Sequence, residues 1–441
     1  MKKPSGWTES SEMNNNKFVF SPETDFLKPD EIRAVQTRYL RSHLQYCKKY
    51  SPFYRKLLRN IPVGHVTPET LKELPFTTKP DISARQDDFI ACSWDEIQDV
   101  VFSSGTTGEP CRIVYTGSDM ERTAFNEQRS LSAAGITKSD RVLLTCTLDR
   151  CFIAGMAYFM GLRKIGAAAI RNGLCSIESH VGVIQRLKPT AVIGVASFLR
   201  NLGEELQKRG VDNSGVRLLI CVGEPLRDET LQLNSIGRQL QERWKGARLV
   251  ATYASSEIAT SFCECPEGCG GHLLADLAYL EVVDEQGNNR EPGEVGEIVV
   301  TPMRATAMPL IRYRTGDVGF MMTERCACGR YTPRLGPILG RKAQMLKCKG
   351  TSIYPQVIFN VLMSIPQVAE YYVVAGGEDL SDTVEVFVAF NTPGGDLRII
   401  EESLQAKCRL NIPVREVPLN EARELVFGIN RKPQHFFDRR R

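Results

Sequence analysis

The stretch around which the rest of the chain is organised is Ser103-Ser-Gly-Thr-Thr-Gly-Glu-Pro110, which directly follows the apolar pair Val101 and Phe102. Its hydroxyl side chains and two glycines are typical of a loop whose backbone amides bind an anion, because glycine lacks the Cβ that obstructs close approach. The ending differs from that of the Gly-Lys-Ser/Thr nucleotide loop, since Glu109 and Pro110 replace the lysine and the hydroxyl. A solvated turn between strands has the same composition, so this stretch alone decides neither interpretation.

Beyond this loop, apolar stretches of strand type alternate with helical stretches of roughly ten residues. In chain order the predicted strands are 112–116, 142–146, 166–170, 191–195 and 218–222, and the predicted helices are 119–131, 153–165, 177–187 and 199–209. An earlier amphipathic helix, from Pro29, is predicted to end near Ser51-Pro52. This alternation indicates an α/β domain with a largely parallel sheet.

Short strands punctuated by turns replace the alternation further along the chain, at 280–284, 287–293, 296–301 and 318–322. We therefore expect the fold class α/β, with a large N-terminal domain of α/β layers, residues 1–340, that includes a β-rich subdomain at about 278–340. A small α+β C-terminal domain is expected at residues 341–441.

Composition excludes several classes of protein. The chain has 441 residues, more than one core usually supports, and its 24% charged residues and net charge of +4 are ordinary for a soluble enzyme. The basic residues are scattered apart from the last three arginines, so nucleic acid is not an expected partner. The least polar stretch, 151–162, is too short to span a bilayer, and no membrane association is expected.

The beginning of the chain lacks the apolar core of a secretory signal, which predicts a cytoplasmic protein. Fourteen cysteines in such a protein are expected to be thiols or metal ligands, not disulfides. The oligomeric state, including a homodimer, is left open.

Further motifs follow in a fixed order: Tyr253-Ala-Ser-Ser-Glu257, Tyr313-Arg-Thr-Gly-Asp317, Gly340-Arg341 and, close to the C-terminus, Lys432. With the Ser/Thr/Gly loop, this series resembles the adenylate-forming superfamily of acyl-CoA ligases, adenylation domains and luciferases. Three more stretches are similar to its phenylacetate-CoA ligase branch in particular: Ser51-Pro-Phe-Tyr54, Leu74-Pro-Phe-Thr-Thr-Lys79 and Cys326-Ala-Cys328-Gly-Arg330.

The resemblance implies an ATP-dependent, AMP-forming ligase that activates an aromatic carboxylic acid with Mg²⁺ and transfers it to coenzyme A. A carboxylate is a poor acylating agent because its leaving group would be oxide, whereas an acyl-adenylate releases AMP. Donors and cations must then stabilise the negative charge that builds on the phosphoryl oxygens. Two alternatives stay open: an adenylating enzyme that passes the acyl group to a carrier protein or AMP to a cofactor, and a catalytically silent nucleotide-binding protein.

The resemblance also implies roles for single residues. Ser256 would contact the α-phosphate, Glu257 would help to hold Mg²⁺, and Lys432, on a small mobile domain, would neutralise the α-phosphate and leave before the thioester step. The expected binding residues are Ser103, Ser104, Gly105, Thr106, Thr107 and Gly108 for the outer phosphates, Gly223, Glu224, Pro225 and Tyr253 around the adenine, Ala254 and Ser255 in the same cofactor-binding segment, Asp317 for the ribose, Arg341 for the nucleotide, and Lys349 and Gly350 for the pantetheine arm. Ala254 is also expected to line the pocket for the acid.

Three of these assignments also have a plain structural interpretation. Ser255 or Ser256 would serve as the N-cap of a helix, Asp317 would be a turn residue after Gly316, and Lys432 would be one more surface lysine.

A second constellation consists of Cys263, Cys265, Cys269 and His272, followed by Cys326 and Cys328. Four thiols or imidazoles suffice for a tetrahedral zinc site, although a loop of free cysteines is the alternative. The resemblance implies that Cys265, His272, Cys326 and Cys328 bind a structural Zn²⁺, which leaves Cys263 and Cys269 as spare thiols.

Overall fold

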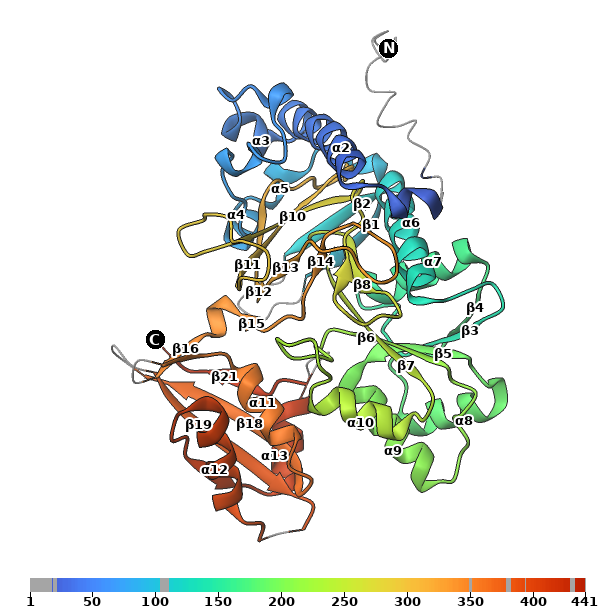
Figure 1. Ribbon diagram of the computed structural model, residues 1–441, viewed down its shortest axis with the longest axis vertical. Coiled ribbons are helices and arrows are strands. Elements are labelled where there is room, and N and C mark those ends of the chain that lie inside the picture. The colour runs from blue at the N-terminus through green and yellow to red at the C-terminus, as the bar shows by residue number, and fades with distance from the viewer. Residues whose placement is uncertain are drawn as a thin grey trace. The chain divides into compact units, whose positions relative to one another are not determined.

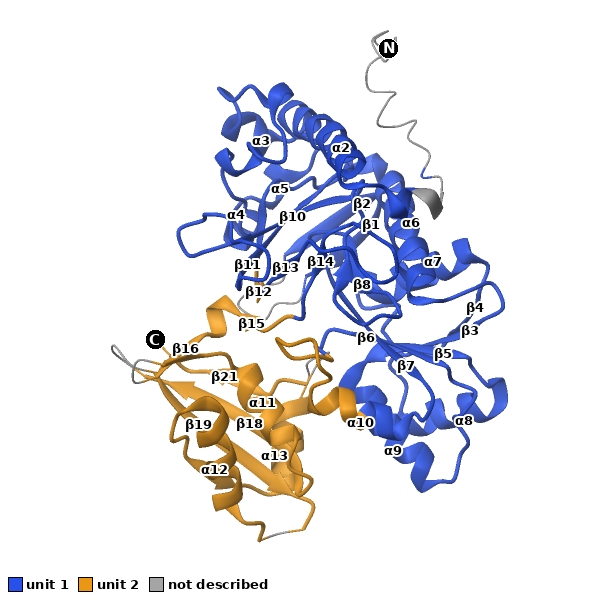
Figure 2. Cartoon of the chain, in the orientation of Figure 1, with its two compact units in different colours: residues 1–225, 240–315, 319–337 blue, residues 226–239, 316–318, 338–441 orange. Residues whose placement is uncertain are grey.

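A computed structural model describes residues 18, 22–103, 111–348, 351–377, 382–392, 394–428 and 433–440. The chain divides into two compact units (Figure 2). Unit 1 comprises residues 1–225, 240–315 and 319–337, and unit 2 comprises residues 226–239, 316–318 and 338–441. Helices and mixed sheets make up both units, so the predicted α/β class is confirmed.

The largest sheet of the described residues lies in unit 1 and has the strand order β13-β14-β9-β8-β7-β6-β5-β3-β4 (Figure 1). Strands β4, β3, β5, β6 and β7 are parallel, and the pairs from β7 to β13 are antiparallel. The strands are β3 (Arg141–Leu144), β4 (Ala168–Arg171), β5 (Ala191–Val195), β6 (Leu218–Val222), β7 (Arg248–Ser255), β8 (Thr260–Glu264), β9 (Gly271–His272), β13 (Met321–Met322) and β14 (Arg334–Leu335). The predicted parallel strands are therefore present.

Two layers of helices cover the parallel part of this sheet. Helices α6 (Gly117–Ala134) and α7 (Ile153–Ile165) lie on one side of the strands, and α8 (Ile177–Leu187) and α9 (Ala196–Lys208) on the other (Figure 1). Thr116 and Asp119 cap the start of α6 reciprocally, and α6 and α7 each end at a glycine in the left-handed region, Gly135 and Gly166. Alternate strand residues face α6 and α7, because side chains of a strand point to opposite faces in turn. This core contains Leu131, Tyr158, Leu162, Val142, Leu144, Ile193 and Ile220.

Smaller elements complete unit 1. They are η1 (Pro22–Phe26), α2 (Pro29–Tyr50), α3 (Pro52–Leu57), η2 (Val63–His65), η3 (Leu71–Glu73), α4 (Lys79–Ala84), α5 (Gln86–Phe89), η4 (Trp94–Glu96), and the pair β1 (Ile97–Phe102) and β2 (Arg112–Thr116). A four-stranded sheet of order β10-β11-β12-β15 contributes β10 (Ala278–Val283), β11 (Gly296–Pro302) and β12 (Tyr313–Gly319), of which residues 316–318 belong to unit 2. As predicted, the first long helix ends at Ser51, whose hydroxyl caps α3. The strand predicted at 287–293 is wrong: this segment is a turn with one bridge, between Val283 and Asn289.

Unit 2 is built on a sheet of order β20-β19-β18-β21. Its elements are α10 (Ser235–Arg243), shared with unit 1, and β15 (Gly340–Arg341), η5 (Lys342–Gln344), β16 (Leu346–Cys348), β17 (Thr351–Ile353), α11 (Pro355–Met363), β18 (Val368–Gly376), β19 (Thr383–Phe390), α12 (Leu397–Cys408), β20 (Val414–Glu416), α13 (Leu419–Phe427) and β21 (Phe436–Asp438). Tyr371 and Val373 pack with α11 and α12, whereas the intervening Tyr372 packs with Ala422 and Val426 of α13. Successive residues of β18 are therefore buried on opposite faces, so helices cover both faces of this sheet.

None of the helices in the described part of the chain combines the length and the apolar composition needed to cross a membrane.

A buried carboxyl in unit 1 predicts a pH-dependent stability. Burial raises the pKa of Glu127 on α6 to about 7. The folded protein therefore keeps a proton that the unfolded chain loses above its ordinary pKa of 4.5, so this residue reduces stability as pH rises through that interval. Relative to wild type, Glu127→Gln is expected to gain up to about 3 kcal/mol of unfolding free energy between pH 5 and pH 8.

Urea denaturation at both pH values checks this expectation. Glu121→Gln is the matched control, since Glu121 is on the same helix with an exposed side chain. If the free energy of unfolding changed equally with pH in Glu127→Gln and in wild type, the expectation would be contradicted.

Candidate active site

The predicted adenine-flanking segments lie at the carboxyl edge of the parallel strands. Gly223 directly follows β6, and Tyr253 lies near the end of β7, where the register places Val222 opposite Thr252. Gly223 has φ of +75°, in the region that favours glycine. The Glu224 carboxylate accepts hydrogen bonds from the Ser197 backbone N–H (2.7 Å) and hydroxyl (2.9 Å), which fixes this turn to the start of α9. Open α/β sheets bind their ligands at this edge.

Ser103 and Cys111, which flank the Ser/Thr/Gly loop, are hydrogen-bonded to each other at the end of the β1–β2 pair. The Ser103 N–H donates to the Cys111 carbonyl (2.9 Å), and the Cys111 N–H donates to the Ser103 hydroxyl (3.2 Å). These bonds extend the antiparallel ladder of β1 and β2. The other predicted residues of the loop lie outside the described residues: Ser104, Gly105, Thr106, Thr107 and Gly108.

A tyrosine joins the base of this loop to the segment 253–257. Tyr115 on β2 is buried, and its hydroxyl donates to the Ser256 carbonyl oxygen over 2.7 Å. The loop base and the end of β7 are therefore neighbours. Burial, and then the charge of Glu257, raise the pKa of Tyr115, so the hydroxyl stays a neutral donor at physiological pH.

The segment after Tyr253 is a hairpin turn, not the start of a helix. Strand β7 ends at Ser255, β8 begins at Thr260, and Ala259 between them has φ of +45°. The interpretation of Ser255 or Ser256 as a helix cap is therefore wrong. Ser256 is buried in this turn, and Ala254 is exposed.

Glu257 is held beside a lysine. Its side chain is 9% exposed, and its Oε1 lies 3.6 Å from Nζ of Lys79, the first residue of α4. A single carboxylate that acts together with substrate phosphates is a common way for proteins to bind Mg²⁺. The predicted magnesium role is compatible with this geometry.

In unit 2, Asp317 and Arg341 form an ion pair, with Oδ1 and Nε 3.3 Å apart. The two residues are also direct partners of the β12–β15 ladder. Asp317 therefore belongs to a strand, and its interpretation as a turn residue is wrong. The predicted residues Lys432, Lys349 and Gly350 lie outside the described residues.

Four predicted metal ligands converge at the antiparallel end of the main sheet, near β8, β9 and β14. The donor atoms of Cys265, His272, Cys326 and Cys328 all lie within 4.8 Å of one another. Cys265 Sγ is 3.7 Å from Cys326 Sγ, and Cys328 Sγ is 3.5 Å from His272 Nε2. Tetrahedral zinc with bonds of about 2.1–2.3 Å holds its donors roughly 3.5–3.8 Å apart, so the set fits this metal.

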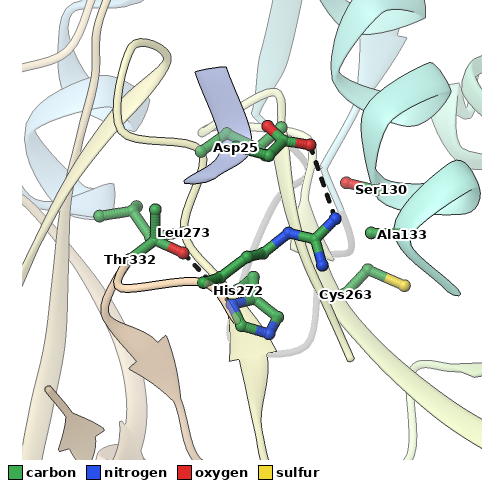
Figure 3. A pocket seen from close by; sticks show the side chains of 9 residues that line it. Asp25, Ser130, Ala133, Cys263, His272, Leu273 and Thr332 are labelled. Carbon is green, nitrogen blue, oxygen red and sulfur yellow. Dashed lines mark hydrogen bonds and ion pairs between the residues drawn. The ribbon is translucent and has the colours of Figure 1, made fainter. Parts of the chain in front are cut away.

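The surroundings of His272 and Cys328 favour the ligand form of these two donors, whereas burial raises the pKa of the Cys265 and Cys326 thiols. His272 Nδ1 lies 3.2 Å from Thr332 Oγ1 (Figure 3), and its Nε2 lies 3.5 Å from Cys328 Sγ. Burial, and then the positive charges of Arg330 and Arg334, lower the pKa of His272 to about 3, so the imidazole is neutral. Burial opposes ionisation of Cys328, but hydrogen bonds from the Arg330 backbone N–H, then from its guanidinium and from the Cys326 and Cys265 thiols, together outweigh burial and lower the pKa of this thiol.

The two spare thiols have other surroundings. Cys263 packs in the apolar core of the main sheet. Cys269 lies 3.6 Å from Cys326 Sγ but outside the set of four, and its sulfur accepts a hydrogen bond from Arg334 (2.9 Å). Behind His272, a small pocket is lined by Asp25, Ser130 and Thr332 among others (Figure 3). It contains none of the predicted nucleotide-binding residues.

Comparison with known proteins gives the family. Residues 55–304 match the family described as AMP-binding enzyme. The chain is 33% identical over 386 residues to a phenylacetate-coenzyme A ligase of Thermus thermophilus, covering 85% of each chain. This chain belongs to the AMP-binding enzyme family. This member is also 29% identical over 357 residues to a phenylacetate-coenzyme A ligase of Escherichia coli K12, covering 78% of each chain.

Solved structures support the fold of this AMP-binding enzyme. The structure of a 2-hydroxyisobutyryl-CoA ligase in the postadenylation state, in complex with 2-HIB-AMP, superposes with a TM-score of 0.84. It covers 96% of this chain and 93% of that chain, at 21% identity. The predicted membership of the adenylate-forming superfamily, in its phenylacetate-CoA ligase-like branch, is confirmed.

Sequence reasoning missed two side chains of this site. Lys79 is the last residue of the branch motif 74–79, but that motif carried no assigned role. Tyr115 is an ordinary residue of a predicted strand, and no local signal indicates that its hydroxyl would contact Ser256.

Proposed function

We propose that this AMP-binding enzyme is an ATP-dependent, AMP-forming ligase that converts an aromatic carboxylic acid into its acyl-adenylate and then into its coenzyme A thioester. The observation that carries the proposal is the convergence at one sheet edge of the turn 223–225, the segment 253–257 and, through Tyr115, the base of the loop that starts at Ser103. Relatives that are named phenylacetate-coenzyme A ligases support an aryl acid and coenzyme A as the substrates.

In the first half-reaction, this chain's residues position ATP and the acid and stabilise the charge that develops. Tyr253 offers a flat ring beside the adenine, Ser256 contacts the α-phosphate, and Asp317 accepts hydrogen bonds from the ribose hydroxyls. Glu257 would hold Mg²⁺, which offsets phosphate charge when bound. Lys432 donates to the α-phosphate, and residues 341–441 act as the C-terminal domain of the family.

In the second half-reaction, the thiol of coenzyme A attacks the acyl carbon and AMP leaves. Lys349 and Gly350 would line the path of the pantetheine arm. We further propose that Cys265, His272, Cys326 and Cys328 bind a structural Zn²⁺ that joins the segment after β8 to the segment between β13 and β14. A cytoplasmic location is proposed as well, since none of the fourteen cysteines, all of which lie in the described residues, forms a disulfide.

ATP–pyrophosphate exchange tests the first half-reaction. Labelled pyrophosphate is expected to enter ATP when an aryl acid such as phenylacetate is present, without coenzyme A. Hexanoate serves as the comparison acid. Failure of every aryl acid to support exchange would refute the proposal.

A further inference from the structure

The backbone next to Lys79 in unit 1 is hydrogen-bonded to the segment 311–314. Thr77, two residues earlier, is fully buried and pairs with β12: its N–H donates to the Arg312 carbonyl (3.1 Å) and its carbonyl accepts from the Arg314 N–H (2.9 Å). The Thr77 hydroxyl donates to the Ile311 carbonyl over 2.7 Å. The backbone that carries Lys79 is therefore fixed to the strand that begins Tyr313-Arg-Thr-Gly-Asp317.

The placement of this lysine is not explained by local helix preferences. Lys79 is the first residue of α4, and the Thr78 hydroxyl and the Asp81 carboxylate cap that helix end reciprocally. A cation at a helix N-terminus is unfavourable, because the unpaired N–H groups there are already positive. An oppositely charged partner of Lys79 is Glu257, on a different element, 3.6 Å away.

Both members of the Lys79–Glu257 pair would have other partners when a metal–nucleotide binds: the metal for the carboxylate and a phosphate for the ammonium. Glu257 is 9% exposed, whereas Lys79 is 26% exposed and has a long, flexible side chain. A carboxylate that pairs with an ammonium is less available to a hard cation, and an ammonium that loses its carboxylate gains most from a nearby phosphate. Binding of a metal–nucleotide at this edge would therefore separate the pair.

We propose that Lys79 is a second ATP-contacting cation, which pairs with Glu257 in the free enzyme and moves to the ATP phosphates when Mg²⁺ takes the Glu257 carboxylate. The proposal rests on the proposed function for the identity of the nucleotide. Under this proposal Lys79 contacts the ATP phosphates only when Mg²⁺ is present, whereas an ordinary phosphate-binding lysine would do so with or without the metal. It also keeps Glu257 neutralised while the site is empty.

Calorimetric binding of the non-reacting analogue α,β-methylene-ATP tests the exchange of partners. With Mg²⁺, Lys79→Met is expected to bind the analogue roughly 10–100-fold more weakly than wild type, because one charged hydrogen bond to phosphate is lost. With EDTA the difference is expected to fall below about twofold, since Lys79 then stays paired with Glu257. Lys56→Met, an exposed lysine paired with Asp88, is the control and should match wild type in both conditions.

A second variant keeps the test independent of folding defects. In Glu257→Gln, Lys79 has lost its carboxylate, so adding Lys79→Met should weaken binding in EDTA as well as in Mg²⁺. A loss of equal size in Mg²⁺ and EDTA on the wild-type background, or no loss beyond that of Lys56→Met, would overturn the inference. Absence of pyrophosphate exchange by wild type with every aryl acid would instead refute the proposed function.

Discussion

Lys432→Ala is expected to slow ATP–pyrophosphate exchange by about 10²–10³-fold, the usual cost of removing one preorganised donor from a developing charge. Adenylation concentrates negative charge on the α-phosphoryl oxygens, and the Lys432 ammonium is the group proposed to neutralise it. Thioester formation from supplied acyl-adenylate is expected to stay within about twofold of wild type, since Lys432 is proposed to act only in the first half-reaction.

The two half-reactions are measured separately, by exchange and by release of AMP from synthetic acyl-adenylate with coenzyme A. Lys407→Ala is the matched control, because Lys407 is an exposed lysine of α12 in the same unit. Exchange by Lys432→Ala at the rate of Lys407→Ala would remove Lys432 from the mechanism.

Loss of the proposed zinc is the second large effect. Cys326→Ser is expected to abolish stoichiometric zinc in the purified protein and to lower the Tm by roughly 5–10 °C, because a structural metal contributes directly to the folding free energy. The four donors come from segments about sixty residues apart in sequence, such as Cys265 and Cys326, so the metal would crosslink unit 1.

Elemental analysis and thermal denaturation read out this prediction. Cys269→Ser provides the control, because its sulfur contacts Cys326 but lies outside the set of four. It should retain zinc and a near-wild-type Tm. Wild-type protein purified without chelator that contains no zinc would contradict the metal assignment, and zinc loss in Cys269→Ser would contradict the chosen ligands.

Local patterns were sufficient for much of the fold. The apolar runs 191–195 and 218–222 are strands of the parallel sheet, because a strand buried on both faces has a continuous apolar sequence. The segment 287–293 failed as a strand, since its two glycines, Asn288 and Asn289 favour a turn. Strands β9 and β14 are only two residues long, which is too short for any periodic signal.

The candidate site was predictable where a motif carries its own chemistry. The set Cys265, His272, Cys326 and Cys328 converges as the resemblance implies. The partners of those motifs were not predictable, because they depend on tertiary contacts. Lys79 and Glu257 are 3.6 Å apart in space but far apart in sequence, and sequence spacing contains no information about that distance.

Aryl-CoA ligase activity is tested most directly by AMP release and thioester formation with a panel of aryl and fatty acids, each with and without coenzyme A. We predict that an aryl acid such as phenylacetate yields AMP and aryl-CoA in equal amounts, and that sustained AMP release requires coenzyme A. Turnover of fatty acids alone, or AMP release from aryl acids that is unaffected by coenzyme A and forms no thioester, would contradict an aryl-CoA ligase.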